Sequence, residues 1–301
     1  RGASFARLNA FQDQIRALLA LVGSGRRLQV QWSCDADYRQ ELLAYHAVTQ
    51  KVSQPEVRRV RNERFTRYWD RMQNRTLRRE RLALFLSIEI TRYSGNLQTA
   101  TGLRDHYAAV MDELQSQFNE FAQTLRTIFH GEATVTPMDD EAHCAMVRNF
   151  LNPSLAESPQ PAVAQIDPKL TIQEQCWLGE GVGQSDGGFY LDGHYHAILT
   201  LDRWPQRTHP GIITHLTGLP FLDYQITVNL TPSPTKGEIH REEKAIERLS
   251  GEYADQRRHS LAVALRKKEQ KVENLASGFV RPFEVCYLIR IWAKSHEALR
   301  E

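Results

Sequence analysis

One run of apolar residues constrains the fold of this 301-residue chain more than any other feature. Between Leu103 and Phe129, apolar residues recur at steps of three or four positions. The members of this run are Leu103, Tyr107, Val110, Leu114, Phe118, Phe121, Leu125 and Ile128. Because that spacing places side chains on one face of an α-helix, the run predicts a long amphipathic helix over 103–129.

In the rest of the chain the apolar residues show two kinds of spacing, one typical of strands and one typical of helices. Apolar residues that alternate or cluster predict strands over 28–32, 82–90, 189–191, 195–201, 224–230 and 283–293. Helical spacing, with glycine or proline near the ends, predicts helices over 5–22, 35–50, 55–79, 139–151, 210–216 and 238–275, and one that starts at Ser295. The 238–275 helix is either continuous or a hairpin that turns near Gly251 or Ser260. We therefore expect an α+β fold of mostly antiparallel strands covered by long charged helices.

A proline-rich segment predicts the domain organisation. Residues 152–171 hold four of the twelve prolines, and proline breaks both helices and sheet ladders. We predict a linker over 152–171 that joins an N-terminal α+β half, 1–151, to a second α+β half, 172–301. In each half a strand leads into helices and then into a strong apolar strand.

Composition excludes several classes of protein. The chain is 41% hydrophobic and 25% charged, so it is not a disordered chain, and its net charge of +2 argues against a uniformly basic nucleic-acid coat. Its apolar runs are far shorter than the ~18 residues that a membrane span needs. The chain begins with Arg1 and shows no leader pattern, so we expect a soluble fragment of a longer protein. Its four cysteines are widely spaced, which is typical of reduced thiols in a cytosolic protein.

The segment from Arg58 to Arg81 has the largest local net charge in the chain. It holds ten arginines against three acidic residues, a local charge of +7. Five of them recur at helical spacing and form what we call the arginine stripe: Arg64, Arg67, Arg71, Arg75 and Arg78. This stripe is the candidate partner-docking face, suited to an acidic protein, anionic lipid headgroups or nucleic acid. The alternative is a solvated helix face that pairs with acidic residues elsewhere.

Catalytic motifs for nucleotide or acyl chemistry are missing from the sequence. A phosphate loop needs glycines before Lys-Ser or Lys-Thr, and Lys294–Ser295 has none in front of it. The glycines between Gly179 and Gly183 have no lysine, so they indicate a hairpin or a loop between strands. Ser233 and Lys236 match Ser-x-x-Lys, but they lie in a proline-rich turn rather than at a helix start. We therefore predict no catalytic residue and no ATP hydrolysis by this chain.

Two histidines are candidate metal ligands. His194 and His196 share one face of a predicted strand, where two imidazoles could bind one metal ion. A catalytic zinc site wants a third protein ligand, and no HExxH or CxxC motif supplies it. The alternative is a pair of surface or hydrogen-bonded strand histidines, so we predict no metal and no cofactor.

Three segments resemble the amino-terminal domain of the CagE/TrbE/VirB family of type IV secretion and conjugation ATPases, including its TraC-like branch. They are Tyr195–Pro232, Phe150–Ser154 and Arg281–Leu299. The first shares the family's order of strand, proline-threonine turn, short helix and second strand, around Pro205, Thr208, Pro210 and Leu219. The family's ATP and magnesium site lies in a RecA-like motor domain that this chain does not contain, so no catalytic residue carries over.

The resemblance implies a non-catalytic interaction and assembly domain of a type IV secretion ATPase. Such a domain is expected to be cytoplasmic and peripheral to the bacterial inner membrane. It contacts other secretion components, and the full-length protein is expected to form a homo-oligomer. The arginine stripe would then be a docking face. Two alternatives stay open: a nucleic-acid-binding module that uses the Arg58–Arg81 basic helix, and a metal-dependent hydrolase that uses His194 and His196.

Overall fold

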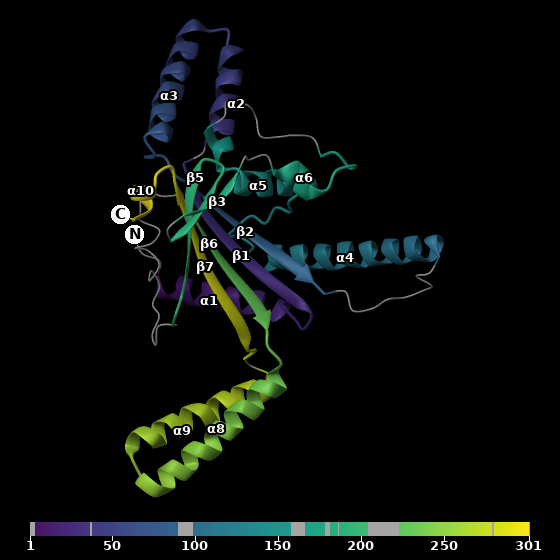
Figure 1. Cartoon of the computed structure of the whole chain (residues 1–301), viewed down its shortest axis with the longest axis vertical. Helices are drawn as coiled ribbons and strands as arrows, with labels where there is room; N and C mark the ends of the chain where they lie inside the picture. The colour runs from purple at the N-terminus through teal and green to yellow at the C-terminus, as the bar shows by residue number, and fades with distance from the viewer. Residues whose placement is uncertain are drawn as a thin grey trace. The chain divides into compact units, whose positions relative to one another are not determined.

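The computed structural model describes residues 4–36, 38–89, 99–157, 166–177, 181–185, 187–203, 223–278 and 280–300. Within them one seven-stranded antiparallel sheet has the strand order β2-β1-β6-β7-β5-β4-β3 (Figure 1). The strands are β1 (Arg26–Asp35), β2 (Arg79–Ile88), β3 (Val182–Ser185), β4 (Gly188–Leu191), β5 (His194–Thr200), β6 (Asp223–Pro232) and β7 (Phe283–Ala293). The predicted α+β class is confirmed.

Helices of very different lengths accompany the sheet. They are α1 (Phe5–Leu21), α2 (Arg39–Gln50), α3 (Pro55–Gln73), α4 (Ala100–Ile128), α5 (Asp140–Leu151), α6 (Ile172–Cys176), α8 (Thr235–Gln256), α9 (His259–Ala276), α10 (His296–Arg300) and the 3₁₀ turn η1 (Pro153–Glu157). The predicted helix over 210–216 lies outside the described residues, as do Ile90 and residues 158–165 of the predicted linker.

The chain forms two compact units that do not follow chain order. Unit 1 comprises residues 1–29, 84–136 and 229–286, and unit 2 comprises 30–83, 137–228 and 287–301. Strands β1, β2, β6 and β7 each contribute residues to both units. The described residues of the predicted linker, 152–157 and 166–171, belong to unit 2. The division of the chain into two sequential halves stays a prediction.

In unit 1 the long helix α4 packs against α1. The Thr99 hydroxyl caps α4 by accepting a hydrogen bond from the Gly102 amide, and Phe121 and Leu125 of its apolar face are buried. Helices α8 and α9 form a hairpin (Figure 1). Arg257 adopts a left-handed conformation, φ 44°, that ends α8. The hairpin alternative is therefore correct, and its turn lies between the two positions considered.

In unit 2 one face of the sheet forms an apolar core. Its buried members are Cys34, Tyr224, Ile226 and Ile289, against which Trp32, Val228, Tyr287 and Ile291 pack. These residues alternate along β1, β6 and β7, so the side chains between them lie on the opposite face. Strand β4 pairs antiparallel with β5, and Asp192 and Gly193, both at positive φ, make the turn between them.

Several element boundaries differ from the sequence prediction. Strand β1 extends to Asp35, so α2 begins at Arg39 rather than at residue 35, and α8 begins at Thr235 rather than at residue 238. The helix predicted over 55–79 ends at Gln73, so the boundary at residue 79 was wrong. Arg75 takes a left-handed conformation, φ 56°, and the Thr76 amide donates to the Arg71 carbonyl, which closes the helix and redirects the chain into β2. Strand β3 lies in the glycine-containing segment and pairs antiparallel with β4, so the hairpin alternative for that segment is correct.

Candidate functional site

A groove of about 850 Å³ lies within unit 2 on the polar face of its sheet. Strands β1, β6 and β7 line it with the residues that alternate with the apolar core, among them Ser33, Gln225, Arg290 and Trp292. The two-residue period of a strand therefore sends one set of side chains to the core and the other set into the groove. This period, together with the strand order, positions the groove residues.

Most of the large apolar side chains that line the groove come from helices or from the segment before α5. Met146, Val147 and Phe150 of α5 line the groove, together with Met138 before α5 and Met72 at the end of α3. Methionine side chains are flexible and polarisable, so they adapt to ligands of different shape. The groove thus combines a polar floor with an adaptable apolar wall.

Basic residues outnumber acidic residues in the groove. The basic residues that line it are Arg39, Arg75, Arg81, Arg290 and Lys294, and the acidic ones are Asp35 and Asp223. Both carboxylates are paired, Asp35 with Arg81 at 2.9 Å and Asp223 with Arg75 at 2.5 Å. The lining therefore carries three positive charges in excess, and the groove is electrostatically suited to an anion.

Arg290 is the most unusual charge in the groove. Its side chain is buried, with 8% of its surface exposed. Its Nε donates to Nδ1 of His196 at 3.2 Å and its Nη1 donates to the carbonyl oxygen of Phe150 at 2.9 Å. Burial lowers the pKa of Arg290 to about 10, so it stays protonated at neutral pH. No carboxylate in the described part of the chain forms an ion pair with it.

Aromatic rings hold the Arg290 guanidinium in place. The Cζ atom of the Arg290 guanidinium lies 4.0 Å from the centre of the Phe150 ring and 5.2 Å from the centre of the Trp292 ring. Cation–π contacts of this kind stabilise a partly desolvated guanidinium. Three elements, α5, β5 and β7, thus fix the orientation of this one side chain.

His196 is neutral and supports Arg290. It is fully buried, stacks on Phe189 with ring centres 4.9 Å apart, and its Nε2 lies 3.4 Å from the Leu191 carbonyl oxygen. Burial, with a further contribution from the positive Arg290, lowers the pKa of His196 to about 3. Nδ1 therefore accepts from Arg290 while Nε2 donates to Leu191. A Cβ at Gly188 would collide with the His196 carbonyl oxygen, so glycine is required at that strand position.

The histidine pair is buried and hydrogen-bonded. His194 is buried as well, and its Nδ1 lies 3.0 Å from the Asp192 carbonyl oxygen. The prediction of hydrogen-bonded strand histidines is correct, and that of surface histidines is wrong. Among the described residues, no group of three or more histidine, cysteine, aspartate or glutamate side chains is placed to hold a metal ion.

The arginine stripe is not one helix face, and that part of the prediction was wrong. Arg64, Arg67 and Arg71 lie exposed on α3, but the helix ends before Arg75 and Arg78. Arg75 lines the groove and pairs with Asp223, and Arg78 lies 3.6 Å from the same carboxylate. The left-handed turn after α3 causes this separation. A docking role for these arginines stays a prediction.

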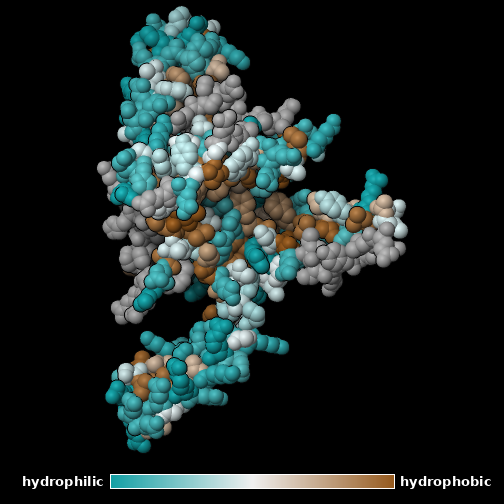
Figure 2. Space-filling view, in the orientation of Figure 1, coloured by the Kyte–Doolittle hydropathy of each residue, from teal (hydrophilic) through white to brown (hydrophobic). Residues whose placement is uncertain are grey.

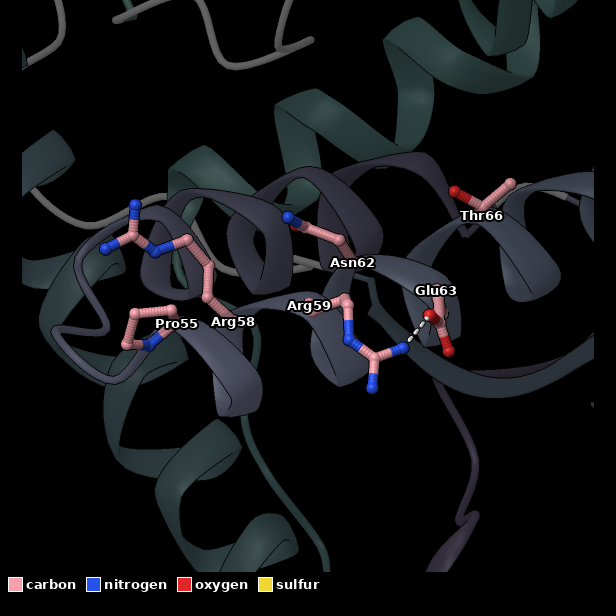
Figure 3. Close-up of a pocket in the computed structure, with 6 residues that line it drawn as sticks. All are labelled: Pro55, Arg58, Arg59, Asn62, Glu63 and Thr66. Carbon is pink, nitrogen blue, oxygen red and sulfur yellow. Dashed lines mark hydrogen bonds and ion pairs between the residues drawn. The ribbon is translucent and has the colours of Figure 1, made fainter.

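A second hollow on α3 is only a surface feature. It measures about 460 Å³ and is lined by Pro55, Arg58, Arg59, Asn62, Glu63 and Thr66 (Figure 3). All six residues come from one helix, and Arg59 is paired with Glu63 at 2.7 Å. Hydrophilic residues cover most of this part of the molecule (Figure 2). A row of side chains on one helix does not enclose a ligand, so we assign no site here.

Two further sequence motifs have ordinary structural roles. The Ser233 amide donates to the Pro282 carbonyl in the turn before α8, as predicted. Lys236 lies in the first turn of α8, which begins at Thr235, so the prediction that the motif does not lie at a helix start was wrong. The four cysteines are free thiols. The fold nevertheless brings the sulfur atoms of Cys144 and Cys176 to 3.5 Å, a proximity that their sequence separation concealed.

Sequence reasoning missed the central residues of the groove. Arg290 lies between Ile289 and Ile291 in a mostly apolar strand, and this charge was the available signal. Phe150 was noted only as part of a family resemblance, and its contact with Arg290 depends on packing between α5 and β7. No property of either segment alone indicates that contact.

Comparisons with known proteins do not assign this chain to a family. A scan against protein-family models found no match, and a search of curated protein sequences found none either. Within the described residues, no helix is both long enough and apolar enough to cross a lipid bilayer.

Proposed function

We propose that this chain is an interaction and assembly domain of a type IV secretion ATPase and that its groove docks another component of the machine. The groove is the observation that carries this proposal: it is about 850 Å³ in volume, has an excess of three positive charges and has an apolar wall. A polar floor beside an apolar wall is the composition of a protein-binding surface. The proposal places the protein in the cytoplasm, peripheral to the inner membrane.

The family resemblance and the groove coincide in the chain. The resembling segment Phe150–Ser154 contributes Phe150 and Pro153 to the lining. The resembling segment Arg281–Leu299 contributes Arg290, Trp292 and Lys294. The third segment, Tyr195–Pro232, contributes Asp223 and Gln225, so all three segments on which the resemblance rests also build the groove. ATP and magnesium belong to the motor domain outside this chain, and the full-length protein is proposed to act as an oligomer.

The test is conjugal transfer by a donor strain that depends on the full-length protein. Changing Lys294→Glu and Met146→Glu should reduce transfer by at least about tenfold, since both charges oppose an anionic partner. ATP hydrolysis by the purified full-length variant should be unchanged. Arg203→Glu, at a fully exposed position outside the groove lining, is the matched control and should transfer normally. Normal transfer by the groove variant would overturn the proposal.

Nucleic-acid binding is the rival function, and α3 is the feature that favours it. Arg64, Arg67 and Arg71 remain exposed along one helix after the stripe is corrected. If this surface binds nucleic acid, the chain will bind a short oligonucleotide with an affinity that falls steeply with salt. Changing these three arginines to Gln would then abolish that binding. We expect no such salt-sensitive binding, because the lining of the groove and not α3 carries the docking function.

A further inference from the structure

We propose that the groove binds an extended acidic peptide segment of a partner protein and that Arg290 receives a carboxylate of that segment. This inference rests on the proposed docking function and adds the chemistry of the partner. The apolar side chains of the peptide would lie against the methionine-lined wall. Three features of the described residues carry it: an uncompensated buried cation, its fixed orientation, and the adaptable wall beside it.

The first feature is the missing counter-charge. Burying a cation is costly unless an anion or several hydrogen bonds compensate it. Arg290 has five N–H donors, and the contacts to His196 and Phe150 use two of them. Within the residues that the structure describes, no acidic side chain pairs with Arg290. A carboxylate from outside the chain would supply both the charge and the acceptors.

The second feature is the orientation of the guanidinium. The rings of Phe150 and Trp292 and the acceptor nitrogen of His196 restrict its plane and its rotation. A planar guanidinium held in this way matches the planar fork of a carboxylate, with two parallel hydrogen bonds. Because the side chain is already ordered, binding costs little further conformational entropy. Lys294, directly after β7, adds another positive charge to the lining.

The third feature is the wall, which favours a peptide over a small anion. Met72, Met138 and Met146 belong to three separate segments, and together they present a flexible apolar surface. A free phosphate or carboxylate ion would leave this surface exposed to water. An acidic peptide with apolar residues would fill both parts of the groove. Nucleic acid would satisfy the charge, but its repeated phosphates would meet Asp35 and Asp223 as well as the basic residues.

The experiment is a selection from a library of short random peptides displayed on phage, with the whole chain as bait. We expect the selected peptides to be enriched in Asp or Glu next to apolar residues. The most enriched peptide, labelled and measured by fluorescence anisotropy, should bind at least about tenfold more weakly to Arg290→Met, since such a loss corresponds to one charge-assisted contact. Its Asp→Asn and Glu→Gln version should lose binding to the original chain similarly.

Controls separate binding from folding. Arg203→Met removes an exposed arginine and should bind normally. Arg290→Lys keeps the charge but not the planar fork, so it should restore only part of the affinity. If Arg290→Met does not fold, Lys294→Gln and Met146→Glu test the same groove from exposed and half-buried positions. Selected peptides without acidic enrichment, or undiminished binding by these variants, would overturn the inference.

The two proposals fail in different ways. If groove variants abolish transfer while the selected peptides are not acidic, the docking function stands and the carboxylate assignment is wrong. If acidic peptides bind through Arg290 while groove variants transfer normally, the peptide site stands and the secretion function is wrong. A labelled oligonucleotide that competes with the peptide and loses affinity in Arg290→Met would instead assign the groove to nucleic acid.

Discussion

Two buried charges of opposite sign behave differently in this molecule. Glu242 in the α8–α9 hairpin of unit 1 is 7% exposed, and Arg290 in the groove of unit 2 is 8% exposed. Glu242 accepts hydrogen bonds from the ammonium groups of Lys268 and Lys271, both at 2.5 Å. Arg290 has no acidic partner among the described residues. Glu242 and Arg290 are thus about equally buried, but only Glu242 has partners of opposite charge.

The difference separates a structural charge from a functional one. Glu242 joins α8 to α9, and its hydrogen bonds to the lysines, that to Lys268 first, hold the pKa of Glu242 below its ordinary value. Its interactions are complete within the hairpin, so it needs no ligand. Arg290 is held by a neutral histidine, a carbonyl oxygen and two aromatic rings, and none of these neutralises it. We therefore expect changes at the two sites to have different consequences.

The largest effect on stability is expected for Glu242→Gln. This change removes two ion pairs between α8 and α9 and should cost about 2 kcal/mol, the scale of hydrogen bonds to charged groups. The cost is not larger because Lys268 and Lys271 are 35% and 47% exposed and can turn to water. Hydrogen exchange of the hairpin amides, together with thermal unfolding, would measure this loss of stability.

The control for this change is Glu243→Gln, the exposed neighbour on the same helix, which should leave exchange unchanged. The pH dependence follows from the lowered pKa of Glu242. Its stabilisation is fully present above the ordinary value of 4.5 and is lost as the pH falls through the lower folded pKa. Unchanged hairpin exchange in Glu242→Gln would remove the contrast between the two charges.

A smaller effect is expected for Asp223→Asn at the edge of the groove. Asp223 is 14% exposed on its side chain and lies within ion-pair distance of Arg75 and Arg78. Losing the Asp223 carboxylate should destabilise the chain by only about 1 kcal/mol. Arg75 and Arg78 are more exposed than Arg290, so water can solvate part of their charge once Asp223 is replaced. The groove would gain one net positive charge, so acidic peptides should bind more tightly. Thermal unfolding and fluorescence anisotropy measure the two effects.

Asp202→Asn, at an almost fully exposed aspartate, is the matched control and should change neither quantity. Weaker peptide binding by Asp223→Asn would mean that Asp223 contributes to the bound state and does not merely reduce the positive charge. That result would mean that the ion-paired Asp223 and the unpaired Arg290 both belong to the peptide site.

The smallest effect is expected on α3. Changing the exposed Arg64, Arg67 and Arg71 to Gln should alter the free energy of unfolding by less than about 0.5 kcal/mol, because exposed charges contribute little. Thermal unfolding and conjugal transfer by the full-length protein are the measurements, with Arg16→Gln on α1 as the control. A large loss of transfer without loss of stability would return the docking function to α3.

Local patterns predicted most elements because they depend on neighbouring residues. The apolar period over 103–129 predicted α4, and the helix predicted over 139–151 is α5, which Asp139 caps by accepting from the Ala142 amide. The end of α3 was missed because arginines are good helix formers, and the left-handed turn at Arg75 depends on hydrogen bonds to the Arg71 carbonyl. Charge spacing alone therefore extended the stripe too far.

The sequence by itself determined the α+β class, the two faces of the strands and the positions of most described helices, α6 excepted, because side-chain period and caps act over a few residues. Only the tertiary structure decided the site. Arg290 reaches His196 across 94 residues of sequence and Phe150 across 140. Whether a buried charge is compensated depends on which distant residues pack around it, and no local pattern contains that information.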